Sequence, residues 1–176
     1  KTGIFTYIRN MYRVKKFVQT SARPPVSSVA SSMHEDTGGS TCTKVISFNV
    51  EETKKINENA YSSGSRFGPA LYLIAGCSHV VHFLNRQRNT AGDLWLPVPY
   101  DGRLRGAEGP LISNCVSFLF YRIPKNKLEN IAQTVNCLSK QMTTQIREGI
   151  PKQYTMFLDM MRHVPLWLYY FLISRT

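Results

Sequence analysis

The sequence predicts an α/β fold in which helices flank a mixed sheet. Two runs with strand character, 94–100 and 114–123, lie in the second half of the chain and are rich in β-branched and aromatic residues. Long runs with helical periodicity stand on either side of them, at 69–88 and 125–148. From residue 41 onward the expected order is therefore strand, helix, helix, strand, strand, helix, helix, which indicates a layered α/β architecture.

Composition narrows the class of protein. A chain of 176 residues suits one domain, and 43% hydrophobic residues can supply a core, which excludes wholesale disorder. The 22 Lys and Arg against 11 Asp and Glu give a net charge of +11. That balance favours anionic partners or, alternatively, reflects solubility or a basic compartment. Localisation stays open between intracellular, membrane-associated and mitochondrial sites.

Residues 1–22 are predicted to form a basic amphipathic helix. Ile4, Ile8, Met11, Tyr12 and Val18 share one side, and Arg9, Arg13 and Lys16 lie opposite. Two interpretations remain open: residues 1–19 dock on an anionic membrane surface, or they form an ordinary surface helix with a solvated basic face.

Residues 23–40 are dense in Pro, Ser and Gly and are predicted to be a linker. A strand is expected over 41–49. Asn49 is the expected N-cap of a short helix that ends near Tyr61, with Glu51 and Glu52 in its first turn.

The next helix, 69–88, is apolar around most of its circumference, which predicts burial on most sides. His79 and His82 share one of its faces, but no third ligand can be identified, so hydrogen-bonded or half-exposed histidines are expected and no metal site. Reduced thiols are expected, since no C-x-x-C motif occurs among Cys42, Cys77, Cys115 and Cys137.

The run 114–123 carries apolar residues on both faces and is expected to be buried on both sides. The helix 125–148 should end at Gly149. The last element, 154–174, contains Pro165, which should kink it. Its apolar run 164–173 is too short to span a bilayer and fits either interfacial anchoring or packing against another part of a larger protein.

The segments LPVPYDGRLR and SNCVSFLFYRIP, with the loop between them, resemble the middle of a condensation-type acyltransferase, and within that superfamily the wax ester synthase/diacylglycerol acyltransferase family. Arg103 corresponds to the family arginine and Asn114 to the asparagine of its second motif. The resemblance covers 1–174 and implies that residues 41–176 form part of an α/β domain like the second half of a chloramphenicol-acetyltransferase-like fold.

The resemblance implies transfer of an acyl group from acyl-CoA, as co-substrate, to a lipid alcohol. The family base lies in a His-His-x-x-x-Asp-Gly motif, which this sequence lacks, so we expect no catalytic residue here. Residues 65–68 also depart from the family's T-V-N-D. The chain is therefore expected to be one piece of a larger polypeptide, with the histidine-bearing half or a larger complex as partner.

Arg103 and Arg105 are the candidate binding residues for the cofactor phosphates, because guanidinium groups pair well with phosphate. The alternative is that both face water or pair with Asp101 or Glu108. Asn114 either lines the substrate tunnel or supports the strand.

Two other functions compete with acyl transfer. A degenerate relative could serve as a structural subunit of a larger, membrane-bound assembly. Nucleic-acid binding is disfavoured, since no zinc finger, helix-turn-helix or RNP-type motif occurs.

Overall fold

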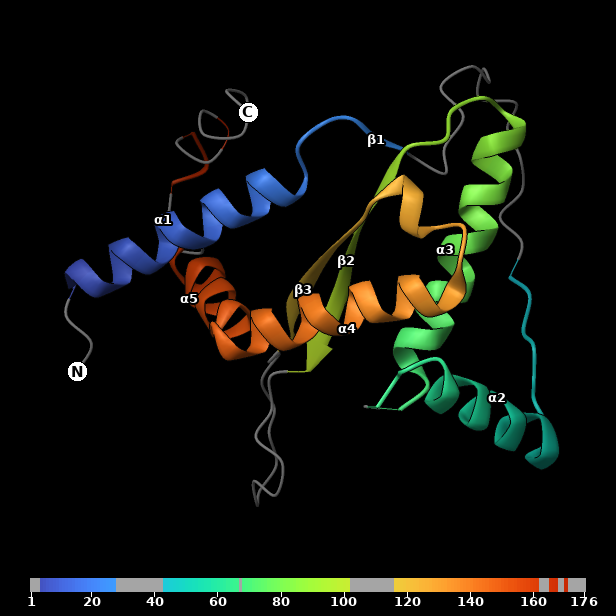
Figure 1. The fold of residues 1–176 in the computed structure, drawn as a ribbon. Helices are drawn as coiled ribbons and strands as arrows, with labels where there is room; N and C mark the ends of the chain where they lie inside the picture. The colour runs from blue at the N-terminus through green and yellow to red at the C-terminus, as the bar shows by residue number, and fades with distance from the viewer. Residues whose placement is uncertain are drawn as a thin grey trace. The chain divides into compact units, whose positions relative to one another are not determined.

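The computed structural model describes residues 4–27, 43–66, 68–101, 116–161, 165–167 and 170, and it has an α/β architecture with a mixed sheet (Figure 1). The described strands form one sheet in the order β1-β2-β3. β1 pairs in parallel with β2, with Val26 opposite Asp93. The predicted α/β class is therefore confirmed. The strands are β1 (Val26–Ser27), β2 (Asp93–Asp101) and β3 (Val116–Ile123).

The chain divides into two compact units. Unit 1 comprises Lys1–Arg23, Leu96–Tyr121 and Met142–Thr176, and unit 2 comprises Pro24–Trp95 and Arg122–Gln141. The bounds of β2, β3 and helix α4 (Ile131–Arg147) show that each of these elements contributes residues to both units.

In unit 1, helix α1 (Ile4–Ser21) packs against helix α5 (Ile150–Met161). Aromatic rings from three segments of the unit meet at Phe120, whose ring centroid lies 6.4 Å from that of Phe17 and 5.1 Å from that of Tyr154. The Ser117 hydroxyl donates a 2.6 Å hydrogen bond to the Pro151 carbonyl. Distant segments of sequence are therefore joined by both apolar and polar contacts.

Unit 2 contains helices α2 (Val50–Ser62) and α3 (Ala70–Gln87), the 3-10 helix η1 (Lys125–Lys127) and the first part of α4. Apolar side chains from its three α-helices, from β2 and β3 and from Leu128 form its core. The buried members are Ala60, Leu71, Ala75, Leu94, Ile123, Leu128, Val135 and Leu138.

Several helix ends follow local sequence signals. Asn49 caps α2 as predicted, because its side chain accepts a 2.8 Å hydrogen bond from the Glu52 amide while the Glu52 carboxylate accepts one from the Asn49 amide. α4 begins at Ile131, later than the predicted residue 125, because the Asn130 side chain accepts the amides of the first turn. α4 ends before Gly149, which has φ +69°.

The expected strand over 41–49 is wrong for residues 43–49, which form no strand. Their side chains are exposed, Val45 to 83%, so the apolar residues that predicted a strand have no sheet to pack against. The sheet instead takes β1, from within the segment 23–40. Residues 41–42 lie outside the described part.

The predicted burial of the second central strand on both sides is confirmed for one face of β3 and only in part for the other, where Phe118 and Arg122 are half-buried and Val116 is 43% exposed. Ser117, Leu119, Tyr121 and Ile123 are buried on one face and Phe120 on the other. Residues 114–115 of the predicted run lie outside the described residues.

Glutamine side chains of α4 bond to the backbone of β3. In unit 1, Gln145 accepts a 2.9 Å hydrogen bond from the Phe120 amide and donates a 2.8 Å one to the Phe120 carbonyl. In unit 2, Gln141 makes the same two bonds to Arg122, at 2.9 and 2.7 Å. The two glutamine side chains therefore supply the hydrogen bonds that a neighbouring strand would make to the backbone of Phe120 and Arg122.

The terminal helices are partly as predicted. α1 matches the predicted basic helix, but its apolar residues do not share one environment: Val14 is buried, whereas Ile8 and Tyr12 are exposed. α5 starts at Ile150, before the predicted residue 154, and most of 162–176 lies outside the described residues. Over the described segments, no helix combines the length and apolar character needed to cross a membrane.

Candidate functional site

The cofactor-binding residues predicted from the sequence lie in the loop between β2 and β3. Arg103, Arg105 and Asn114 all fall within 102–115, outside the described residues, so their roles stay predictions. The structure does describe both ends of that loop, since β2 ends at Asp101 and β3 begins at Val116. β2 and β3 are neighbours in the sheet.

A charged cluster of unit 2 joins the other ends of these two strands, which are the start of β2 and the end of β3. Asp93, the first residue of β2, accepts hydrogen bonds of 3.1 and 3.0 Å from the Arg122 guanidinium through its Oδ2 atom. Its Oδ1 atom accepts a 3.0 Å bond from the backbone amide of Lys125. Arg122 also donates to the Pro25 carbonyl at 3.4 Å. Both carboxylate oxygens are thus engaged, and Asp93 acts as a structural anchor between strand ends.

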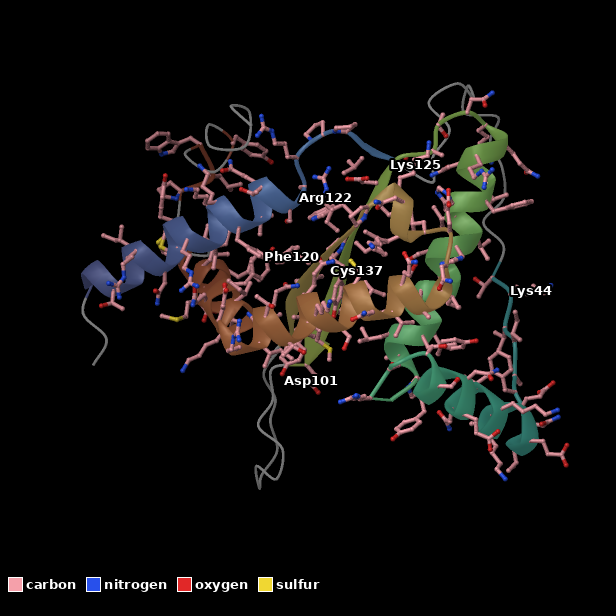
Figure 2. All side chains as sticks on the ribbon, in the orientation of Figure 1. Lys44, Asp101, Phe120, Arg122, Lys125 and Cys137 are labelled. Atoms are coloured by element: carbon pink, nitrogen blue, oxygen red, sulfur yellow. The ribbon has the colours of Figure 1, made fainter. Side chains whose placement is uncertain are left out.

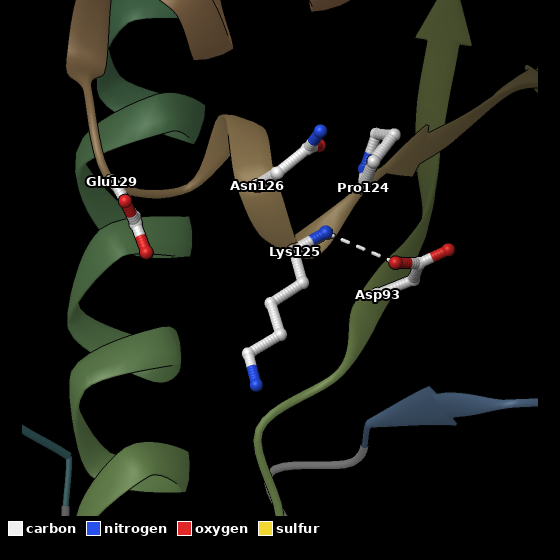
Figure 3. A pocket seen from close by; sticks show the side chains of 5 residues that line it. All are labelled: Asp93, Pro124, Lys125, Asn126 and Glu129. Atoms are coloured by element: carbon white, nitrogen blue, oxygen red, sulfur yellow. Dashed lines mark hydrogen bonds between the residues drawn. The ribbon is translucent and has the colours of Figure 1, made fainter.

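A shallow pocket of about 350 Å³ lies beside this anchor, lined by Asp93, Pro124, Lys125, Asn126 and Glu129 (Figure 3). Figure 3 shows the Lys125 side chain extending away from the Asp93 carboxylate that its backbone amide binds. Lys125 and Glu129 are exposed. The pocket therefore presents side chains of opposite charge to water.

Polar side chains lie on the buried face of α3. His79 Nε2 lies 3.0 Å from Thr134 Oγ1, which itself donates a 2.6 Å hydrogen bond to the Lys127 carbonyl. Since a hydroxyl has a single proton, the histidine is the donor in the first contact. The prediction of a hydrogen-bonded histidine is confirmed for His79.

His82 differs from that prediction. Its side chain is only 4% exposed, and its Nε2 atom has no hydrogen-bond partner among the described residues. Burial lowers the pKa of His82 below 6.5, and the positive charges of Arg86, Lys125 and His79 lower it further against the opposing effect of Glu129. His82 is therefore a buried imidazole whose surroundings favour the neutral form.

The opposite face of α3 is apolar and exposed. Val80 is 60% and Phe83 59% exposed, and Leu73 and Cys77 lie on the same side of the helix. The prediction that this helix is buried on most sides is wrong. Its buried positions are occupied by Leu71, Ala75, Ser78, His82 and Asn85, a set more polar than the face it presents to solvent.

The described residues contain no group of three or more His, Cys, Asp and Glu side chains placed to hold a metal ion. The described cysteines, Cys77 and Cys137, are free thiols, and Cys137 accepts a 3.2 Å hydrogen bond from the Gln141 amide. Figure 2 shows Cys137 on α4 and Arg122 on β3. Cys137 lies within hydrogen-bonding range of the Arg122 carbonyl, at 4.0 Å, and so belongs to the packing of α4 on β3.

Sequence reasoning missed Asp93 and the unpartnered His82. For Asp93 a signal was present, since an acidic residue directly precedes the predicted strand 94–100 and an arginine stands near the end of the next predicted strand. His82 stood out in the sequence beside His79, but no pattern in the sequence shows that its Nε2 atom is buried without a described hydrogen-bond partner.

Comparison of the chain with protein-family models, with curated proteins and with solved structures finds no match.

Proposed function

We propose that this chain is part of an O-acyltransferase that moves an acyl group from acyl-CoA to a lipid alcohol, and that it contributes the half without the catalytic histidine. One observation carries the proposal: β2 and β3 form as adjacent strands and flank the loop 102–115. That is the element order which the resemblance of LPVPYDGRLR and SNCVSFLFYRIP implies.

In the proposed reaction, a histidine of the other half takes the proton of the alcohol, and the alcohol oxygen attacks the thioester carbonyl carbon. The carbon–sulfur bond breaks, and coenzyme A leaves as the thiol after taking up that proton. The role of this chain is to bind. Arg103 and Arg105 hold the phosphates of coenzyme A, and Asn114 lines the substrate tunnel where the loop re-enters the sheet.

The outer face of α3 supports a two-part arrangement. Leu73, Val80 and Phe83 would be exposed apolar residues on an isolated domain, and such a face marks a surface that another part covers. The occupant we propose is the histidine-bearing half of the enzyme. Apolar side chains of that half and of this α3 face would then together exclude water from the acyl chain.

The test is acyl-CoA binding by the chain, measured by isothermal titration with palmitoyl-CoA and with coenzyme A. We expect the double substitution Arg103→Gln/Arg105→Gln to weaken binding of both ligands at least about tenfold, since each phosphate contact is charge-assisted. The matched control Arg147→Gln/Lys152→Gln removes the same charge from exposed positions and should change binding less than about twofold. Equal losses in the two variants would contradict the assignment of the phosphate site.

A structural subunit is the second candidate function, and the exposed apolar residues Leu73, Val80 and Phe83 of α3 support it, because such a face suits contact with another subunit. In that case the same α3 face would bind another subunit. The chain would then co-purify with a partner at fixed stoichiometry, and the complex would bind no acyl-CoA. Palmitoyl-CoA binding that depends on Arg103 and Arg105 would contradict this alternative.

A further inference from the structure

The solvent-facing side of α1 combines basic and apolar side chains. Ile8 is 56% and Tyr12 69% exposed, one helical turn apart, and they lie next to each other on the helix surface. The exposed basic residues Arg9, Arg13, Lys15 and Lys16 flank them on both sides. The opposite side of the helix carries Val14 and faces the unit, where α1 contacts α5.

This basic face is nearly uncompensated. α1 contains no acidic residue, and Arg13 alone makes a described ion pair, to Glu148 at 3.1 Å. Arg9, Lys15 and Lys16 have no described ion-pair partner. An exposed helix face with cations around an isoleucine and a tyrosine is complementary to an anionic lipid surface, where the cations meet headgroups and the apolar side chains enter the interface.

A second feature of unit 1 points to the same ligand. Leu166, Trp167 and Tyr170, which follow α5, are exposed, Trp167 to 72%. Tryptophan and tyrosine favour the boundary between headgroups and acyl chains. Unit 1 therefore has two described sets of exposed interfacial side chains, one on α1 and one after α5. The set on α1 is accompanied by the basic residues named above.

We propose that the face of α1 formed by Ile8, Arg9, Tyr12, Lys15 and Lys16 docks unit 1 on an anionic bilayer surface. The bilayer attracts the three cations, and Ile8 and Tyr12 supply the part of the binding that salt does not screen. This binding is independent of acyl transfer, so its failure would leave the proposed function untouched.

The experiment is sedimentation of the full chain with vesicles of phosphatidylcholine alone or with about one-third phosphatidylglycerol. We expect binding to the anionic vesicles only. Arg9→Gln/Lys15→Gln/Lys16→Gln should weaken it at least about tenfold. The control Lys55→Gln/Lys140→Gln/Lys152→Gln removes the same charge from other exposed positions and should weaken it less than about threefold.

A third variant, Ile8→Ser/Tyr12→Ser, tests the apolar part. Because both side chains are exposed, the fold should be unchanged by circular dichroism, while the binding that survives high salt should be lost. The proposal would be overturned if the Arg9/Lys15/Lys16 variant and the Lys55/Lys140/Lys152 control lost vesicle binding to the same extent. It would also be overturned if the wild-type chain bound neutral and anionic vesicles equally. Binding to poly(U) as tight as to anionic vesicles, and insensitive to Ile8→Ser/Tyr12→Ser, would assign the basic face to nucleic acid instead.

Discussion

At the scale of single residues, Asp93 determines how the strand ends of unit 2 are held. Its two oxygens accept hydrogen bonds from the Arg122 side chain and the Lys125 backbone, so one side chain links β2, β3 and η1. Both partners of the ion pair are less than one-third exposed. Removal of the carboxylate would leave the arginine partly desolvated and without its main counter-charge.

Asp93→Ala should therefore lower the free energy of unfolding by about 2 kcal/mol, measured by urea denaturation. Asp93→Asn should lower it less, because the amide oxygen can still accept the Lys125 amide. The control is Glu58→Ala, which removes an exposed carboxylate 4.0 Å from Lys54 and should change stability by less than about 0.5 kcal/mol. Equal effects of Asp93→Ala and Glu58→Ala would contradict the anchoring role.

His82 makes stability depend on pH. Its pKa in the folded protein is lowered below 6.5, so under mildly acidic conditions the unfolded chain binds more protons than the folded one. The free energy of unfolding should therefore fall as pH drops through the window between 6.5 and the lowered folded pKa. His82→Gln should make this fall smaller.

The measurement is urea unfolding at about pH 7.5 and about pH 5.5 for the wild type, His82→Gln and the exposed control Lys55→Gln. Lys55→Gln should retain the wild-type difference between the two pH values. An unchanged difference in His82→Gln would show that His82 is not the group responsible.

At the scale of elements, α4 is held to β3 by glutamine amides as well as by apolar packing. Gln145 is buried and binds both the amide and the carbonyl of Phe120. Gln145→Ala would remove one hydrogen bond from each of these two backbone groups, so we expect a loss of about 2 kcal/mol in the free energy of unfolding. Gln133→Ala, an exposed change of the same type on the same helix, should change it by less than about 0.5 kcal/mol.

Thermal and urea unfolding of the two glutamine variants decide between these outcomes. A Gln145→Ala protein as stable as Gln133→Ala would mean that water or a shifted helix replaces the amide. It would then follow that the Gln145 amide adds little to the hold of α4 on β3.

Elements with strong local signals could be predicted from the sequence, and those that depend on distant partners could not. The cap at Asn49, the stop at Gly149 and the burial of β3 follow from short stretches of chain. The strand expected at 41–49 fails over 43–49 because no sheet partner is present there. The two-residue strand β1 has no periodicity of its own and is defined by pairing with β2.

At the scale of the whole molecule, the sequence pattern predicted the high apolar content of α3 but not which face of the helix is buried. A helix that is apolar all round looks buried, yet Ser78, His82 and Asn85 occupy the inner face and Val80 and Phe83 the outer one. The α/β class could be predicted, since it needs only the order of elements. The candidate site rests on Arg103, Arg105 and Asn114, whose arrangement depends on loop geometry that no sequence pattern specifies.

The measurement that tests the central claim most directly is the intact mass of the protein isolated from its natural source, with peptide mapping. We predict a mass more than double the 20.1 kDa of this chain, with a His-His-x-x-x-Asp-Gly peptide before it, or a tightly bound second chain that carries that motif. A mass near 20.1 kDa, with no chain bearing the motif in the purified complex, would contradict the claim that this chain is half of an acyltransferase.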